Sequence, residues 1–317
     1  MQAPIQGSPA LAAAVAEAGA FGMLGVGWHS LADIRQAVRQ TRERTQRPFG
    51  ANLVLWEPQH ERLAVLLDEQ VRLVSIFWGD AAPYIPAIHA GGALAAVTVG
   101  SAEEAYRAAQ AGADLVVAQG WEAGGHVWGS VATLPLVPAV VDAVAPLPVV
   151  AAGGVGDGRG LAAVLVLGGA GIWIGSRFIA SCESEFQELY KQRIVAAVET
   201  EPMHGDIFDA DWKKAPHRVL VNSTVQRWLD AGSPATNDRP GAGEIIAWTP
   251  RGDEIERYSI MEPAAELRGE TEALAMYAGQ SAGVIGAVQS VQDIVISIVA
   301  TAERSLERVS SSLLGNA

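Results

Sequence analysis

The chain has 317 residues, of which 22 are basic and 35 acidic, giving a formal net charge of -13 and a pI near 4.9. This length suits one α/β barrel of about 250 residues with a smaller addition. The acidic balance lacks the basic footprint expected of a nucleic-acid-binding protein. A single cysteine, Cys182, rules out an internal disulfide framework and suits a reducing cytoplasm. No stretch reads as a signal peptide or a membrane span, so we expect a cytoplasmic protein without a membrane partner.

Apolar strand-like runs alternate with alanine-rich helical runs, which is typical of successive βα units. The predicted strands are residues 21–25, 49–55, 73–78, 93–99, 114–119, 148–153 and 171–178. The predicted helices between them include residues 31–44, 57–68, 102–111 and 158–167. The stub Gln2-Ala3-Pro4 ahead of the first helix supplies the end of an eighth strand, which either is very short or lacks its start in this sequence. The sequence therefore predicts an α/β fold, a (β/α)8 TIM barrel.

The βα rhythm ends near residue 190. Residues 199–266 have mixed polarity, contain the turn-rich stretch AGSPATNDRPGAGE and show no βα period. Helical patterns return at residues 270–277 and in the amphipathic tail 291–314. We predict a barrel over residues 1–198, an added substrate or cap domain over 199–268, and C-terminal helices over 269–317 that pack back on the barrel.

Two glycine-rich turns follow the last two predicted strands, where TIM barrels often bind phosphate. They read AAGGVGDGRG and WIGSR, so that Gly153, Gly154, Gly175 and Ser176 would offer backbone N–H groups and a hydroxyl. One such loop alone is more readily explained as a tight turn. Two on adjacent strands favour a phosphate site. Arg177 could assist the phosphate or form a structural ion pair.

The stretch QGWEAGGHVWG, residues 119–129, follows another predicted strand. Gln119 offers an amide to the polar edge of a planar ring, and Gly124 allows a ligand to approach the backbone closely. His126 is the one imidazole in this glycine-rich loop, and its pKa suits proton transfer near neutrality. We therefore favour a catalytic or substrate-binding His126. Glu122 stays unassigned, because a loop glutamate is more often a cap or a solvated charge.

Asn52 lies midway in the apolar strand FGANLVL, where a buried amide needs hydrogen-bond partners. A ligand's carbonyl and ring N–H or the neighbouring backbone would serve equally well. At the end of the first strand, Ala3, Pro4 and Ile5 present main-chain groups beside a fixed proline. The remaining histidines show no ligand spacing, so we expect no metal site.

These segments resemble the nitronate monooxygenases, formerly called 2-nitropropane dioxygenases. That family shares an FMN-dependent barrel with a bacterial enoyl-acyl-carrier-protein reductase and certain NADH:quinone reductases. The resemblance rests on APIQGSPALAAAVAEAGAFGMLG, GANL, AQGWEAGGH, PVVAAGGVGDGRG, GSRF and YAGQ. It implies that His126 is the catalytic base and that FMN is held by Ala3, Pro4, Ile5, Asn52, Gln119, Gly124, Gly153, Gly154, Gly175 and Ser176. Ile5 stands where the family usually has methionine, and Ser176 where it usually has threonine.

The function implied by this resemblance is the oxidation of alkyl nitronates by flavin and O₂ to a carbonyl compound and nitrite. The partners would be a small-molecule substrate and O₂. One alternative is an NAD(P)H-dependent flavin reductase of an enoyl thioester or a quinone, although no obvious basic patch is present for an acidic acyl carrier protein. Another is a non-catalytic flavin-binding module that senses redox state. The oligomeric state is left open, with a homodimer as one option.

Overall fold

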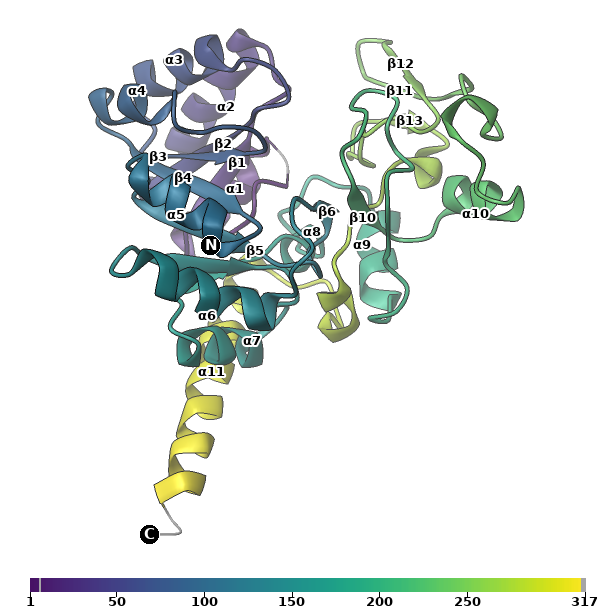
Figure 1. Cartoon of the computed structure of the whole chain (residues 1–317). Helices are drawn as coiled ribbons and strands as arrows, with labels where there is room; N and C mark the ends of the chain where they lie inside the picture. The colour runs from purple at the N-terminus through teal and green to yellow at the C-terminus, as the bar shows by residue number, and fades with distance from the viewer. Residues whose placement is uncertain (6, 315–317) are drawn as a thin grey trace.

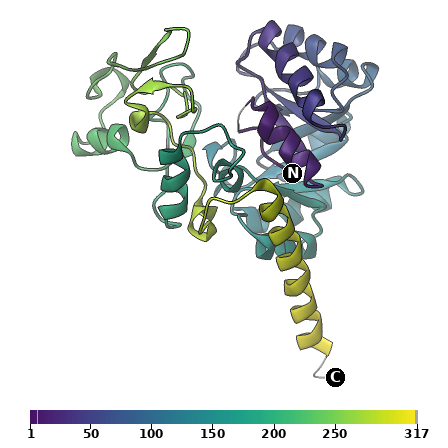
Figure 2. The same cartoon turned by 180° about the vertical axis from the view of Figure 1, so that it is seen from behind.

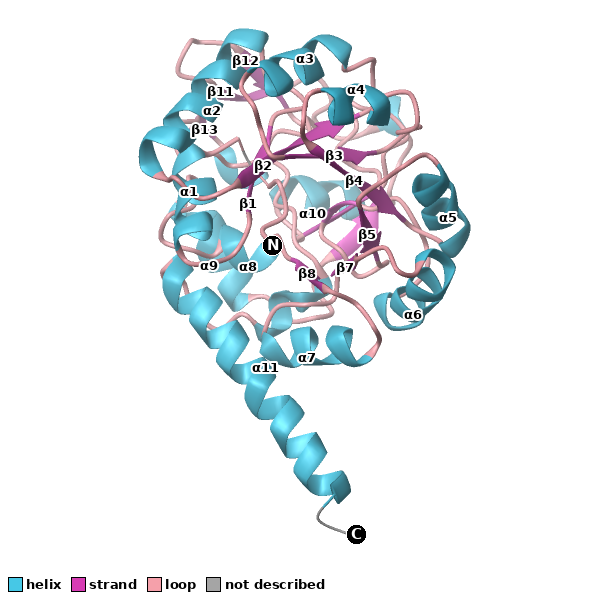
Figure 3. Cartoon of the chain, turned by 90° about the vertical axis from the view of Figure 1, so that its left-hand side faces the viewer, coloured by secondary structure: helices cyan, strands magenta, loops and turns pink. Residues whose placement is uncertain are grey.

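A parallel sheet of seven strands forms the centre of the protein, for which the computed structural model describes residues 1–5 and 7–314. The strand order is β1-β2-β3-β4-β5-β7-β8, and the sheet curls into a barrel (Figure 3). The strands are β1 (Gly22–Gly25), β2 (Phe49–Val54), β3 (Leu73–Phe77), β4 (Leu94–Val99), β5 (Leu115–Gln119), β7 (Val149–Ala152) and β8 (Gly171–Trp173). Each lies within a predicted strand.

The N-terminal stub closes the ring between β8 and β1. Gln2 pairs with Ile174 in a parallel bridge, and the Ala3 N–H donates to the Ile174 carbonyl at 2.8 Å. On the other side, the Gln2 N–H donates to the Phe21 carbonyl at 3.0 Å. The Gln2 side chain also bonds both the N–H and the carbonyl of Met23, at 3.1 Å each. The predicted TIM barrel is therefore confirmed, with the stub in the place of its first strand.

Helices cover the outside of the barrel (Figure 1). They are α1 (Pro9–Glu17), α2 (Leu31–Arg44), α3 (His60–Asp68), α4 (Ile85–Ala90), α5 (Ala102–Gln110), α6 (Thr133–Val144), α7 (Gly158–Val166) and the short α8 (Ser176–Ile179). Strands of such a sheet are covered on both faces and need near-continuous apolar runs. Accordingly, every residue of β2 except Val54 is buried. Inside the barrel, the core includes Met23, Val117 and Trp173.

Residues 188–290, which we call the added segment, build smaller elements beside the barrel (Figure 1). They are α9 (Glu188–Ala196), α10 (Ser223–Asp230) and two three-stranded sheets. One sheet joins β6 (Gly125–His126), β10 (His217–Val219) and β9 (Met203–Gly205); the other joins β12 (Glu254–Glu256), β11 (Ile245–Trp248) and β13 (Arg268–Gly269). Since β6 comes from the barrel's own loop, the first of these sheets ties the added segment to the barrel. The domain boundaries at residues 198 and 268 remain predictions.

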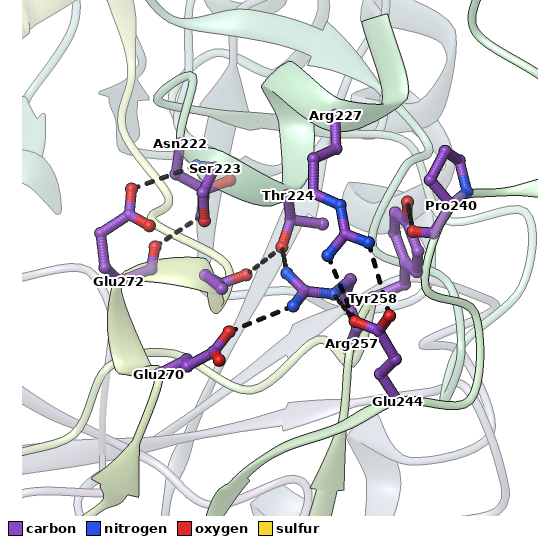
Figure 4. Close-up of polar contacts among 11 residues, drawn as sticks. Asn222, Ser223, Thr224, Arg227, Pro240, Glu244, Arg257, Tyr258, Glu270 and Glu272 are labelled. Carbon is purple, nitrogen blue, oxygen red and sulfur yellow. Dashed lines mark hydrogen bonds and ion pairs between the residues drawn. The ribbon is translucent and has the colours of Figure 1, made fainter. Parts of the chain in front are cut away.

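Buried charge organises the far part of this added segment (Figure 4). The Arg257 guanidinium donates to Glu244 Oε2 at 2.9 Å, to Thr224 Oγ1 at 2.9 Å and to Glu270 Oε2 at 3.2 Å. A buried charge is tolerated when its donors are paired in this way. These contacts join α10 to the ends of the strands in the sheet of β11–β13, through a buried arginine whose carboxylate partners reach solvent.

Two predicted elements differ from the structure. The helix predicted over residues 270–277 is only a 3₁₀ turn, Thr271–Ala273. The following chain is extended because Tyr277 bridges Val219 and the Ala278 N–H donates to the Arg218 carbonyl at 3.2 Å. The strand predicted over residues 171–178 ends at Trp173, since α8 starts at Ser176.

Helix α11 (Val291–Leu314) returns to the barrel, as predicted for the tail. Its buried residues Val291, Ile294 and Ile298 share a core cluster with residues of α1 and α7. Beyond this contact the helix extends past the body of the protein (Figures 1 and 2). Within the described part of the chain, no helix is both long and apolar enough to cross a membrane.

Candidate active site

His126 is held in place by a strand pair between the barrel loop and the added segment. In this antiparallel pair, His126 of β6 lies opposite His217 of β10, and the Val127 N–H donates to the Pro216 carbonyl at 2.9 Å. The His126 Nδ1 atom is 3.1 Å from the Ala215 carbonyl oxygen. A carbonyl can only accept, so this bond assigns the proton to Nδ1. Nε2 is then the unprotonated nitrogen, which can accept a proton.

The surroundings keep His126 neutral. Burial, with a further contribution from the nearby His217, lowers the pKa of His126 from 6.5 to about 3, although the bond to Ala215 raises it. Besides the His217 ring at 5.4 Å, the rings of Trp212, Tyr277 and Trp78 surround the imidazole, at centroid distances of 4.3, 5.5 and 6.1 Å. No sequence motif connects these residues with His126.

His217 uses the same carbonyl but has a different role. Its Nδ1 is 2.9 Å from the Ala215 oxygen, and its Nε2 accepts the Phe208 N–H at 3.2 Å. Both ring nitrogens are thus bonded within a side chain that is fully buried. Burial lowers the pKa of His217 as well. We assign His217 a structural role, in contrast to His126, whose Nε2 makes no hydrogen bond to another described residue.

Gln119 at the end of β5 shapes the loop that carries His126. Its Nε2 donates to the His126 carbonyl at 2.9 Å, and its Oε1 accepts the Trp128 N–H at 2.9 Å. The side-chain amide therefore spans the His126 loop and fixes its distance from β5. A contact with a cofactor ring, as the sequence suggested, stays a prediction.

The two glycine turns lie on adjacent strands, as expected. Gly153 and Gly154 follow β7 with φ of 91° and 69°, in the left-handed region that favours glycine. The N–H groups of Gly154 and Gly175 make no backbone hydrogen bond to another described residue. The Ser176 hydroxyl accepts the Gly279 N–H at 3.0 Å. Unpaired N–H groups of this kind bind phosphate oxygens well.

A segment from the C-terminal part of the chain completes this region. A Cβ atom on Gly124 would lie 2.3 Å from the Gly279 nitrogen, so glycine is needed for the chain itself to pass closely. The Gln280 N–H donates to the Glu122 carbonyl at 3.0 Å. The YAGQ stretch was visible in the sequence only as part of a resemblance, and nothing local assigned it a position beside the glycine loops.

Arg218 of β10 also belongs to this region, although nothing in the sequence singled it out. Its guanidinium is buried, donates to the Trp121 carbonyl at 2.6 Å and to the Ala123 carbonyl at 3.2 Å, and lies 5.2 Å from the Trp121 ring centroid. Burial lowers the pKa of Arg218, while Glu122 raises it. Arg218 thus fixes the backbone of the glycine-rich loop from the side of the added segment.

The residues whose roles were left open have structural contacts. Glu122 accepts the Thr133 N–H at 2.9 Å at the start of α6, so it acts as a cap. Arg177 is buried and donates to the carbonyls of Ala180 and Ala287. The Asn52 amide donates to the Ser75 hydroxyl at 2.8 Å and to the Ser75 carbonyl at 3.2 Å.

The end of the stub lies beside the second glycine turn. The Ala3 N–H is engaged with Ile174, and the Ile5 N–H donates to the Ala3 carbonyl at 2.8 Å. A Cβ on Gly175 would be 3.1 Å from the Ile5 side chain. The stub residues Ala3, Pro4 and Ile5 therefore reach the rim where a cofactor is expected.

Other polar groupings lie outside this region. A hollow of about 720 Å³ lined by Arg42, Arg47 and Arg72 lies at the amino ends of β2 to β4, the opposite end of the barrel from His126. Functional groups of such barrels gather at the carboxyl ends of the strands. Among the described residues, no group of three or more His, Cys, Asp or Glu side chains could hold a metal ion.

Known proteins match this chain over most of its length. Residues 2–61 and 56–301 match the family model described as nitronate monooxygenase. A relative from Mycobacterium tuberculosis, named (3aS,4S,5R,7aS)-5-hydroxy-7a-methyl-1-oxo-octahydro-1H-indene-4-carboxyl-CoA dehydrogenase, is 31% identical, covering 95% of this chain and 91% of its own. FabK from Thermotoga maritima has a TM-score of 0.85 and 31% identity, covering 98% and 94%. Nitroalkane oxidase from Streptomyces ansochromogenes has a TM-score of 0.77 and 26% identity, covering 97% and 96%.

Proposed function

Because the chain belongs to the nitronate monooxygenase family, we propose that it is an FMN-dependent oxidoreductase that converts alkyl nitronates and O₂ to carbonyl compounds and nitrite. One observation carries the proposal. A neutral histidine and two glycine turns, whose Gly154 and Gly175 N–H groups are unpaired among the described residues, occur on loops at the carboxyl ends of neighbouring strands, β5, β7 and β8. The imidazole suits proton handling, and the turns suit a phosphate.

The residues at this rim fit FMN. The turn at Gly153 and Gly154, where both glycines are left-handed, and the turn at Gly175 and Ser176 at the start of α8 would hold its phosphate, because glycines leave backbone N–H groups unshielded. Ala3, Pro4, Ile5, Asn52, Gln119 and Gly124 complete the proposed FMN-binding set. FMN would supply the electron transfer and the reaction with O₂. The protein would orient the substrate, exclude water and handle the substrate's proton.

His126 is the proposed catalytic residue. Its Nε2 would accept the α-proton of a neutral nitroalkane, while the Ala215 carbonyl keeps the other ring nitrogen protonated. A pKa of about 3 makes this base weak, because the best catalytic bases have a pKa near the working pH. A nitronate has already lost this proton. We therefore propose nitronates as better substrates than neutral nitroalkanes.

A flavin reductase is the second candidate, favoured by the similarity to FabK. The relative named a CoA dehydrogenase supports a CoA thioester as substrate, although its name denotes oxidation of that thioester. Under this alternative, NAD(P)H would reduce the flavin, and an enoyl thioester or a quinone would be reduced in turn. The same phosphate turns and the same neutral histidine would serve that reaction.

One set of experiments separates these functions. Heat-released flavin from the purified protein should be FMN, identified by chromatography. Anaerobic mixing with NADH or NADPH should leave the flavin spectrum unchanged, whereas ethyl nitronate in air should yield nitrite. Rapid bleaching by NAD(P)H without nitrite release would establish the reductase instead. A protein that binds FMN but shows neither reaction would be a non-catalytic module, and a colourless protein that takes up no FMN would refute both enzymatic proposals.

A further inference from the structure

Five tryptophans form a connected group beside His126, which we call the tryptophan wall: Trp28, Trp56, Trp78, Trp128 and Trp212. We infer that the tryptophan wall recognises a flat, apolar ring in the substrate. This inference rests on the proposed function, because it specifies which nitronates the same site would take.

The indoles contact one another in sequence. Trp56 stacks on Trp28 with ring centroids 4.5 Å apart and planes 17° apart. Trp212 is 5.6 Å from Trp28, 4.7 Å from Trp78 and 4.3 Å from His126. Trp128 contacts Trp78 edge-on at 4.7 Å. The group thus runs without a break from Trp56 to the proposed catalytic imidazole.

The positions of these residues in the fold explain the arrangement. Trp28, Trp56 and Trp78 follow β1, β2 and β3 and therefore lie at the carboxyl ends of adjacent strands. That is the functional rim of a TIM barrel. Trp128 follows β6, and Trp212 comes from the added segment. Barrel and added segment both contribute indoles to one surface.

Part of this surface is open to solvent. The side chains of Trp28, Trp56 and Trp128 are 41%, 37% and 37% exposed, whereas Trp212 next to His126 is 8% exposed. Large apolar groups exposed side by side mark binding sites more often than single exposed ones do. Trp248 of β11 is equally exposed, at 40%, but stacks with no ring among the described residues.

Backbone strain provides a second, independent observation. Trp78 has a φ of 64°, in the left-handed region, and Gly79 follows with a φ of 75°. A bulky residue rarely adopts this conformation, and such strain gathers at functional sites. In return, the indole of Trp78 contacts Trp128, Trp212 and His126. Glycine or asparagine would relieve the strain but could not build this surface.

The chemistry of the wall defines its occupant. Aromatic rings prefer stacked or edge-to-face contacts with other rings, and none of the five side chains in the wall is charged. A two-carbon nitronate is too small to cover three exposed indoles. The substrate that fits has a phenyl, naphthyl or fused-ring group near the carbon that bears the nitro group.

Binding can be tested without turnover by using carboxylates, which are planar anions like nitronates. Calorimetry with the FMN-loaded protein should give a Kd for 2-naphthylacetate about tenfold below that for propionate. Trp28→Ala and Trp56→Ala should each remove most of this preference, Trp56→Phe should retain part of it, and Trp248→Ala should retain all of it. Circular dichroism and FMN content check that each variant is folded.

A kinetic arm compares 2-phenylethyl nitronate with ethyl nitronate. We expect a higher kcat/KM for the phenyl compound and loss of that advantage in Trp56→Ala. Turnover of both nitronates with no ring preference would overturn the inference and leave the proposed function standing. Tight, tryptophan-dependent binding of 2-naphthylacetate with no nitronate turnover would support the inference about ring recognition but refute the proposed function. Equal Kd values for both carboxylates would overturn the inference.

Discussion

The low pKa of His126 makes the stability of the fold depend on pH. In the unfolded chain a histidine binds a proton below about pH 6.5, but in the folded protein His126 binds one only near its pKa of about 3. Between these values the unfolded state holds more protons, so the free energy of unfolding falls as the pH falls. Each pH unit contributes about 1.4 kcal/mol, so lowering the pH from about 6.5 to about 5 should cost about 2 kcal/mol through His126 alone.

Urea unfolding of wild type and His126→Gln measures this contribution, with saturating FMN and equal m-values at both pH values. The variant removes the titrating group but keeps a polar side chain of similar reach. The remaining titratable groups are the same in both proteins, so we compare how steeply the free energy of unfolding of each protein depends on pH. We expect wild type to lose about 2 kcal/mol more than the variant. Parallel slopes would show that His126 titrates normally in the fold, and the argument for a neutral, weak base would fail.

Four further predictions concern the rim. Gly154→Val should abolish FMN retention, because a β-branched residue does not tolerate a φ of 69°; an unchanged ratio of flavin to protein absorbance would mean that the phosphate lies elsewhere. Gly124→Ala places a Cβ 2.3 Å from the Gly279 nitrogen and should lower unfolding free energy by about 1–3 kcal/mol in urea, which an unaltered midpoint would contradict. Lys213 and Lys214 are exposed beside Trp212 and would attract an anionic substrate electrostatically. Changing both to Gln should lower kcat/KM for a nitronate anion several-fold at low salt and leave kcat/KM for a neutral nitroalkane unaffected. A salt dependence of kcat/KM equal to that of wild type would exclude this electrostatic attraction. His126→Asn should slow oxidation of a neutral nitroalkane by roughly 10²–10⁴-fold and of its nitronate far less, whereas equal losses would make His126 a binding residue.

The sequence could predict those strands and turns that depend mainly on the residues of one short segment. Residues 49–55 are apolar apart from Asn52, because a barrel strand is covered on both faces, so the strand can be recognised from its own sequence. Glycine pairs at positions 153–154 indicate left-handed turns for the same local reason. Repeated along the chain and alternating with helical runs, such strands predicted the barrel. The phosphate site at the glycine turns stays a prediction.

The surroundings of His126 could not be predicted in this way. Trp212 and Tyr277 approach it from far along the chain, and Ala215 bonds to it through its backbone. Contacts between residues so far apart in the chain produce no regular sequence pattern from which they could be predicted. The chain near Tyr277 also has a helical pattern, which pairing with β10 overrides.

One carbonyl oxygen, that of Ala215, accepts bonds from both His126 and His217. Alanine scanning would never reveal it, because every amino acid supplies the same oxygen. What must be preserved is the course of the main chain between Trp212 and His217. Lengthening this connection by one residue would therefore disturb the protonation pattern of two imidazoles at once, although every side chain in the neighbourhood would still be present. For anyone exchanging segments between relatives, the length of this loop matters as much to the proposed site as His126 itself.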